Sequence, residues 1–165
     1  MMEMTESASH AKRARIWAVM AMGTMLVYFV LVNHVNLSPW NNLVSSQLSS
    51  TLAGVIPFAI YMLAFAIGVR WLMLIGVVHS YVWLLLQVRQ WWVPYLLGPT
   101  PIHEDFRWYT EHGYTATIKF LPAIADRPVP DAQHIVQQVL SLVVVVATTW
   151  AYVLTRKEAR IRGGA

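Results

Sequence analysis

The 165-residue sequence contains no cysteine. This absence excludes disulfides, thiolate catalysis, iron–sulfur clusters and cysteine-ligated zinc, and it leaves the redox compartment open. The sequence is also poor in charge, because only 12% of its residues are Asp, Glu, Lys or Arg while 57% are hydrophobic. Soluble globular domains carry about a quarter charged residues. The composition therefore predicts an integral membrane protein.

Four apolar runs without any Asp, Glu, Lys or Arg dominate the chain, at residues 16–32, 52–68, 71–88 and 135–154. Each is long enough to cross the hydrocarbon layer as a helix. A cleaved signal peptide is the alternative for the first run, but the run is longer than a typical signal sequence and no small-residue cleavage site follows it. We therefore predict an all-α membrane protein, a four-transmembrane-helix bundle that forms a single integral membrane domain over residues 1–165.

Basic residues are distributed unevenly around these runs. Four spans place both termini and Arg70 on one side of the membrane, and this side holds eight of the 12 Lys and Arg residues but only three of the eight acids. The positive-inside rule then predicts cytoplasmic termini in the cell membrane and an extracytoplasmic loop at residues 98–134. The basic tails are expected to orient the protein and contact anionic lipid. Nucleic acid is not an expected partner, because no aromatic residues are interleaved with the basic ones.

The loop at residues 98–134 holds most ionisable residues outside the basic tails. Thr100 as N-cap, Pro101 at the first helical position and Gly113 after the last turn predict a short amphipathic helix over residues 101–112. Its apolar stripe is Ile102, Phe106 and Tyr109.

Three further local features of the connections can be read from the sequence. Residues 114–120 alternate between apolar and polar side chains and predict an extended segment. Asp131 is the expected N-cap of the fourth span. Ser38 followed by Pro39 predicts that a helix begins near Pro39, and whether residues 39–50 lie on the membrane or continue the second span is left open.

The candidate catalytic residues lie at the extracytoplasmic mouth of the expected bundle: His134 and Asp131 at the head of the fourth span, with His103 and Glu104 on the loop helix. Imidazole and carboxylate groups together can divide acid and base roles. The alternative is that these groups only cap helices in a solvated loop. The spacing lacks the HExxH and di-iron patterns, so no metal is assigned and the cofactor stays unknown.

The candidate ligand-binding residues lie on the third span. His79, Trp83 and Gln87 recur at four-residue intervals, and Trp91 and Trp92 follow near the headgroups. An ionisable group in the middle of a span is a functional candidate.

An alternative for His79 is a structural one, in which it hydrogen-bonds Tyr28, Tyr61 or Ser141 on a facing helix. The fourth span also has a polar face, formed by Gln137, Ser141 and Thr148, which is expected to meet the His79 stripe.

Three classes of function fit this sequence. The first is an enzyme or binding protein for a lipid, isoprenoid or quinone-like compound, with an apolar cavity and a polar mouth. The second is a non-catalytic subunit or assembly partner of a larger membrane complex. A transporter or channel fits least well, because no carboxylate lies inside a span and no internal repeat is visible. The expected partners are the lipid bilayer, a small apolar ligand, and further copies of the chain or other membrane subunits.

Overall fold

The structure, a computed structural model, describes residues 2–41, 48–98 and 106–163. Four long helices dominate it: α1 (Met2–His34), α2 (Leu48–Ile67), α3 (Arg70–Leu97) and α5 (Ala132–Gly163). Each contains a segment long and apolar enough to cross a membrane, within Ala8–His34, Leu48–Ile67, Arg70–Leu97 and Ala132–Ile161. The described ranges contain no β-strand, only an isolated bridge between Lys119 and Asp131. The predicted all-α architecture, with four helices long and apolar enough to span a membrane, is confirmed.

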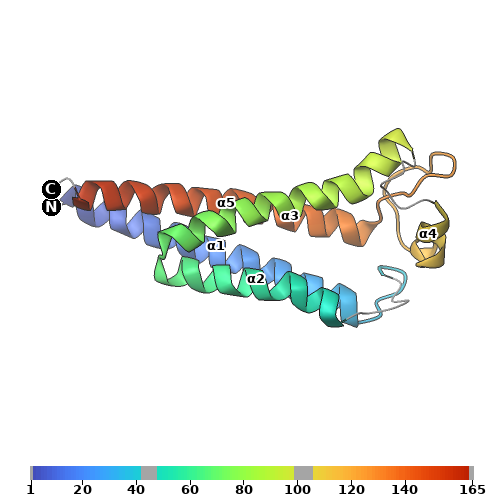
Figure 1. Cartoon of the computed structure of the whole chain (residues 1–165), viewed down its shortest axis with the longest axis horizontal. Coiled ribbons are helices and arrows are strands. Elements are labelled where there is room, and N and C mark those ends of the chain that lie inside the picture. The colour runs from blue at the N-terminus through green and yellow to red at the C-terminus, as the bar shows by residue number, and fades with distance from the viewer. Residues whose placement is uncertain (1, 42–47, 99–105, 164–165) are drawn as a thin grey trace.

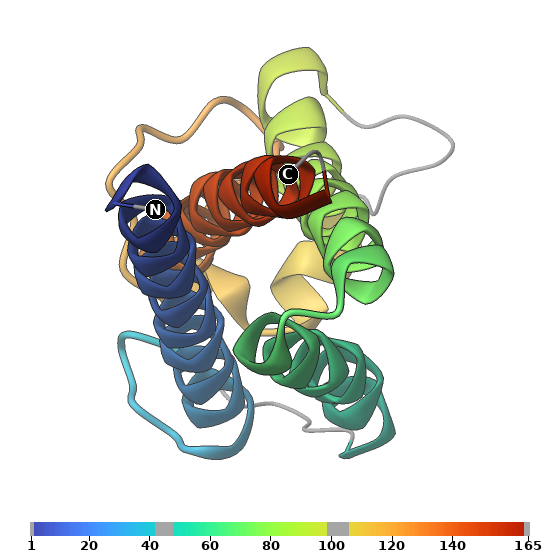
Figure 2. The ribbon, with the colours of Figure 1, turned by 90° about the vertical axis from the view of Figure 1, so that its left-hand side faces the viewer.

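The four long helices form a bundle in which successive helices alternate in direction, and both termini lie at the same end (Figure 1). Viewed from that end, the helices form a ring in which α2 contacts α1 and α3, while α5 contacts α3 and α1 (Figure 2). The contact between α1 and α5 is the most extensive. We refer to the two ends of the bundle as the terminal end and the loop end.

Small and apolar residues at helical spacing form the core of the bundle. Ala14, Ala18, Met22 and Met25 lie on one face of α1 and are almost fully buried. Alanine on this face lets α1 and α5 approach closely. The opposite pattern holds on the outside, where large apolar side chains are exposed, such as Leu85 at 64%. That distribution suits a bundle surrounded by lipid.

The connection between α1 and α2 differs from the prediction at Pro39. Residues 35–41 are not helical, so a helix does not begin near Pro39, and α2 begins at Leu48. Asn41 explains the difference, because its side-chain amide donates to the carbonyl oxygens of Val32 (2.7 Å) and Val35 (2.8 Å) at the end of α1. The segment folds back to cap α1 instead of starting a new helix.

Two glycines end helices in the left-handed conformation. Gly68, between α2 and α3, has φ +83°, and its backbone N–H donates to Ala64. Gly113 has φ +74° and follows the short helix α4 (Phe106–Glu111), as predicted. Both positions favour glycine because a side chain strains this conformation.

Helix α4 lies at the loop end, away from the termini (Figure 1). The predicted helix over residues 101–112 is present from Phe106, and residues 101–105 lie outside the described ranges. Tyr109 is 1% exposed, and its hydroxyl donates to the carbonyl of Val129 (3.2 Å), whereas Phe106 is half-buried against it. Phe106 and Tyr109, two residues of the predicted apolar stripe, therefore pack at the loop end.

The prediction of an extended segment over residues 114–120 is wrong at its start. Tyr114–Ala116 forms a 3₁₀ turn, in which the Tyr114 ring packs against Trp91. The chain is extended from Thr117, where Ile118 accepts a hydrogen bond from the backbone of Ala132 (2.8 Å) and donates one to Pro39 (3.0 Å). Aromatic packing at Tyr114 thus overrides the alternating pattern, while backbone pairing keeps Ile118 and Lys119 extended.

Candidate functional site

A cavity of about 250 Å³ lies at the loop end of the bundle. It is bounded by α1, α3, α5 and the 3₁₀ turn after α4. The residues that line it are Phe29, Val32, Asn33, Trp83, Gln87, Tyr114, Gln133, His134 and Gln137.

Two glutamines on α5 give the cavity its polar character. Gln137 is 6% exposed, and neither its Oε1 nor its Nε2 has a hydrogen-bond partner among the described residues. The Oε1 of Gln133 and the Nε1 of Trp83 are likewise buried without partners there. An unpaired buried polar group costs about 1–3 kcal/mol. Such groups in a cavity are free to hydrogen-bond water or another small molecule that enters it.

Gln87 joins α3 to α5 beside the cavity. Its Nε2 donates to the hydroxyl of Ser141 (2.9 Å), which in turn donates to the carbonyl of Gln137 (2.8 Å). The polar face predicted on the fourth span, at Gln137 and Ser141, does meet the third span here. These bonds hold the two helices in register where the cavity opens.

Asp131 and His134 form a pair at the start of α5. Asp131 is fully buried, and its Oδ1 accepts a hydrogen bond from the backbone N–H of His134 (3.0 Å), which confirms the predicted N-cap. The same oxygen lies 2.6 Å from Nδ1 of His134, and the hydroxyl of Thr117 donates to Oδ2 (2.9 Å). A hydrogen bond from Nδ1 to the carboxylate leaves Nε2 of the neutral ring as an acceptor. The pair can therefore orient an imidazole that lines the cavity.

The rings of Trp91 and Tyr114 pack against the imidazole of His134. The ring centroid of Trp91 lies 3.9 Å from that of His134, and that of Tyr114 lies 5.5 Å away. Trp91 is not among the lining residues of the cavity, but its ring packs against the imidazole that is. Trp92 is not a lining residue either, and its Nε1 donates to Gln138 (2.7 Å).

His79 lies deeper in the bundle than the cavity lining. Its ring packs against Phe58 (5.0 Å between centroids), Tyr61 (5.3 Å) and Trp83 (6.4 Å). In the part of the chain that is described, its Nε2 is buried without a hydrogen bond. The alternative that His79 hydrogen-bonds a facing helix is therefore wrong, because it contacts the rings around it instead. His79 reaches the cavity only indirectly, through Trp83.

The candidate residues of the loop helix cannot be placed beside this cavity. His103 and Glu104 lie outside the described residues, so their part in a shared site stays a prediction. Within the described ranges no group of three His, Asp or Glu side chains is arranged to hold a metal ion.

The loop at the same end holds two further ionisable groups, the buried Tyr109 and the half-buried Lys119. Burial and the negative charge of Asp131 raise the pKa of Tyr109 to about 12. Burial lowers the pKa of Lys119, and Asp131 opposes this effect. The Lys119 ammonium donates to the carbonyl of Thr117 (2.9 Å) and lies 5.6 Å from the centre of the Tyr109 ring. Asp131 therefore influences the loop as well as His134.

Of the residues predicted from the sequence, His134, Trp83 and Gln87 line the cavity and Asp131 pairs with His134, but Gln133, Phe29, Asn33 and Tyr114 were not assigned to a site. The sequence feature that relates some of these residues to the site is their spacing along a helix. Gln133 and Gln137 are four residues apart, as are Phe29 and Asn33, so each pair shares a helix face. Which faces meet could not be read from that spacing.

No family model, no curated protein and no solved structure matches this chain.

Proposed function

We propose that the protein binds a neutral amphiphile, such as a lipid, isoprenoid or quinone-like compound, in the cavity at the loop end. The observation that supports this proposal most directly is Gln137, whose buried amide has no partner among the described residues and lines the cavity. A ligand oxygen there would satisfy its donor, and a ligand hydroxyl its acceptor.

The lining supports a neutral head group. Among the described residues that line the cavity there is no Lys, Arg, Asp or Glu. Amides, an indole and an imidazole hydrogen-bond carbonyl and hydroxyl groups, while Phe29, Trp83 and Tyr114 offer ring faces for a flat or apolar part. Drug-sized ligands occupy about 300–1,000 Å³. A cavity of about 250 Å³ therefore suits a head group whose apolar tail stays in the bilayer.

The pair of Asp131 and His134 would also let the site catalyse a reaction that needs proton transfer. An imidazole oriented by a carboxylate can accept a proton from a hydroxyl within hydrogen-bond reach of Nε2. An enzyme acting on the bound amphiphile is therefore an extension of the same proposal.

Ligand binding can be tested by thermal unfolding of the purified protein in detergent. The probes are a decyl-substituted benzoquinone, farnesol and monoolein, with decane as the probe that lacks a head group. At least one oxygen-bearing probe should raise the unfolding temperature. Gln137→Leu should weaken its binding about tenfold, which corresponds to the loss of one hydrogen bond.

The matched control is Gln90→Leu, the same substitution on α3 at a residue that does not line the cavity. It should leave probe binding unchanged. The proposal is overturned if decane stabilises the protein as strongly as the other probes, or if Gln90→Leu and Gln137→Leu have equal effects. If no probe stabilises it, the alternative of a non-catalytic membrane subunit is favoured.

We also propose that the termini face the cytoplasm and the loop end faces outward in the cell membrane. The unequal distribution of Lys and Arg supports this orientation. Since the chain has no cysteine, single cysteines can report on each side. Thr110→Cys should react with an impermeant thiol reagent in intact cells, and Ala165→Cys should react only after lysis. The reverse pattern would overturn the orientation and move the cavity to the cytoplasmic side.

A further inference from the structure

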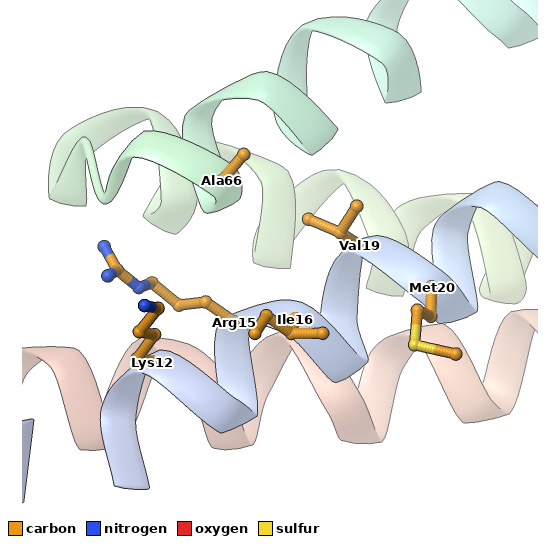
Figure 3. Close-up of a pocket in the computed structure, with 6 residues that line it drawn as sticks. All are labelled: Lys12, Arg15, Ile16, Val19, Met20 and Ala66. Carbon is orange, nitrogen blue, oxygen red and sulfur yellow. The ribbon is translucent and has the colours of Figure 1, made fainter. Parts of the chain in front are cut away.

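A groove runs between α1 and α2 at the terminal end, the end opposite the cavity. Its volume is about 230 Å³. Figure 3 shows the residues that line it, Lys12, Arg15, Ile16, Val19 and Met20 on α1 and Ala66 on α2.

The lining separates charge from apolar surface along the groove. Its five residues on α1 recur at intervals of three, one, three and one, so they share one helix face. Lys12 and Arg15 lie at one end of the groove, and Val19 and Met20 lie further along α1 (Figure 3). From Lys12 to Met20 the helix rises about 12 Å. The groove is thus cationic at the membrane boundary and apolar further along the span.

Arg15 is held at the turn between α2 and α3. Its guanidinium lies against Gly68, where an added Cβ would clash with Nη1. Its Nε is buried without a hydrogen bond, and neither Lys12 nor Arg15 forms an ion pair among the described residues. A buried cationic donor without a partner is unfavourable. The buried Nε of Arg15 therefore indicates a site for an anion, and the exposed ammonium of Lys12 lines the same groove and adds a second positive charge.

We propose that this groove binds one anionic phospholipid. The phosphate would lie between Lys12 and Arg15, and an acyl chain would lie along Ile16, Val19 and Ala66. A guanidinium pairs with phosphate oxygens through two parallel hydrogen bonds, and the apolar wall selects a lipid over a water-soluble phosphate. This site is independent of the function proposed for the cavity, because the two lie at opposite ends of the bundle.

The test measures lipid binding to the full chain in detergent by native mass spectrometry. The probes are phosphatidylglycerol, phosphatidylcholine with the same acyl chains, and glycerol 3-phosphate. Phosphatidylglycerol should be retained at least about tenfold more tightly than the other two. Arg15→Gln should lower its affinity about tenfold, as expected for a lost charge-assisted hydrogen bond.

The matched control is Arg13→Gln, which makes the same change of charge at an exposed residue outside the groove. It should leave the affinity within about twofold, since one surface charge contributes little. Ala66→Trp provides a second test that keeps both cations, because it fills the groove and should also displace the lipid. Should Arg15→Gln fail to fold, Ala66→Trp and Lys12→Gln decide the result.

Three outcomes would overturn the proposal. Equal losses in Arg13→Gln and Arg15→Gln would mean that general surface charge attracts the lipid. Equal binding of phosphatidylcholine would remove the role of the anion. Equal binding of glycerol 3-phosphate, or unchanged binding in Ala66→Trp, would mean that the acyl chain does not occupy the groove.

Discussion

The two ends of the bundle differ in the charge of the polar side chains that line their cavity and grooves. At the loop end the described residues that line the cavity are mainly neutral amides and rings, and the fully buried carboxylate of Asp131 has hydrogen bonds to both oxygens. At the terminal end cations line grooves on two sides of the bundle: Lys12 and Arg15 between α1 and α2, and Arg70 and Arg156 between α3 and α5.

This difference has an electrostatic reason. Burying a neutral amide costs much less than burying a charge, so amides can line an interior cavity without a charged partner. Cations are tolerated at the membrane boundary, where anionic head groups and water neutralise them. One helical scaffold can therefore present a neutral interior site at one end and charged surface grooves at the other. The following four predictions test this comparison.

The largest effect is expected at the loop end from Asp131→Ala. The change removes the N-cap of α5 and leaves Thr117 and His134 without their acceptor. We expect the free energy of unfolding to fall by about 3 kcal/mol, measured by denaturant titration in detergent. The matched control is Asp126→Ala, at an exposed aspartate of the same loop, which should change stability by under about 0.5 kcal/mol. Equal effects would show that Asp131 is an ordinary loop carboxylate.

The second prediction concerns the pH dependence of the loop packing. The pKa of Tyr109 is raised to about 12 in the folded protein from an ordinary 10, mainly by burial. A raised folded-state pKa gives stability that is complete below pH 10 and is lost as the pH rises toward 12. Between about pH 9 and 12 the unchanged protein should lose about 2 kcal/mol more than Tyr109→Phe.

Comparison with Tyr109→Phe isolates this titration. Lys119 affects stability with the opposite sign, because burial lowers its pKa, but it is present in both proteins. Parallel stability curves for the two proteins would show that Tyr109 is not buried in the folded state.

At the terminal end a smaller effect is expected from Gly68→Ala. The backbone at Gly68 has φ +83°, and an alanine Cβ would clash with the Arg15 guanidinium. We expect a loss of about 1–2 kcal/mol from backbone strain and displacement of Arg15. Gly163→Ala is the matched control, since nothing lies within 4 Å of its added Cβ, and it should be neutral. A neutral Gly68→Ala would mean that the turn and Arg15 are not held as described.

The smallest effect is expected between the two ends, at His79. Its buried Nε2 has no partner among the described residues, and its ring packs against Phe58, Tyr61 and Trp83. His79→Phe keeps a ring and removes the unpaired nitrogen, so stability should change by under about 0.5 kcal/mol or rise slightly. A loss of 2 kcal/mol or more would reveal a hydrogen bond that His79 makes in the membrane.

Local patterns in the sequence determined the spanning helices and several of their ends. The apolar runs predicted four spanning helices because the length of an uncharged run directly measures how much hydrocarbon it can cross. The predicted N-cap at Asp131 and helix-ending glycine at Gly113 are also confirmed. Both features depend only on backbone within a few residues, so the local sequence is enough to predict them. The predictions at Pro39 and Tyr114 were wrong. Asn41 ties the segment around Pro39 back to the end of α1, and Trp91 of α3 packs against the ring of Tyr114.

Only the tertiary structure decided what the polar residues form together. Gln87 and Ser141 are 54 positions apart in the sequence, yet they share a hydrogen bond, and Phe29 of α1 faces the same cavity as Gln137 of α5. Helical spacing shows which residues share a face, but the rotation of each helix about its axis follows from packing of all four helices. The cavity and the groove are therefore properties of the ring of helices, because each is lined by side chains from at least two helices.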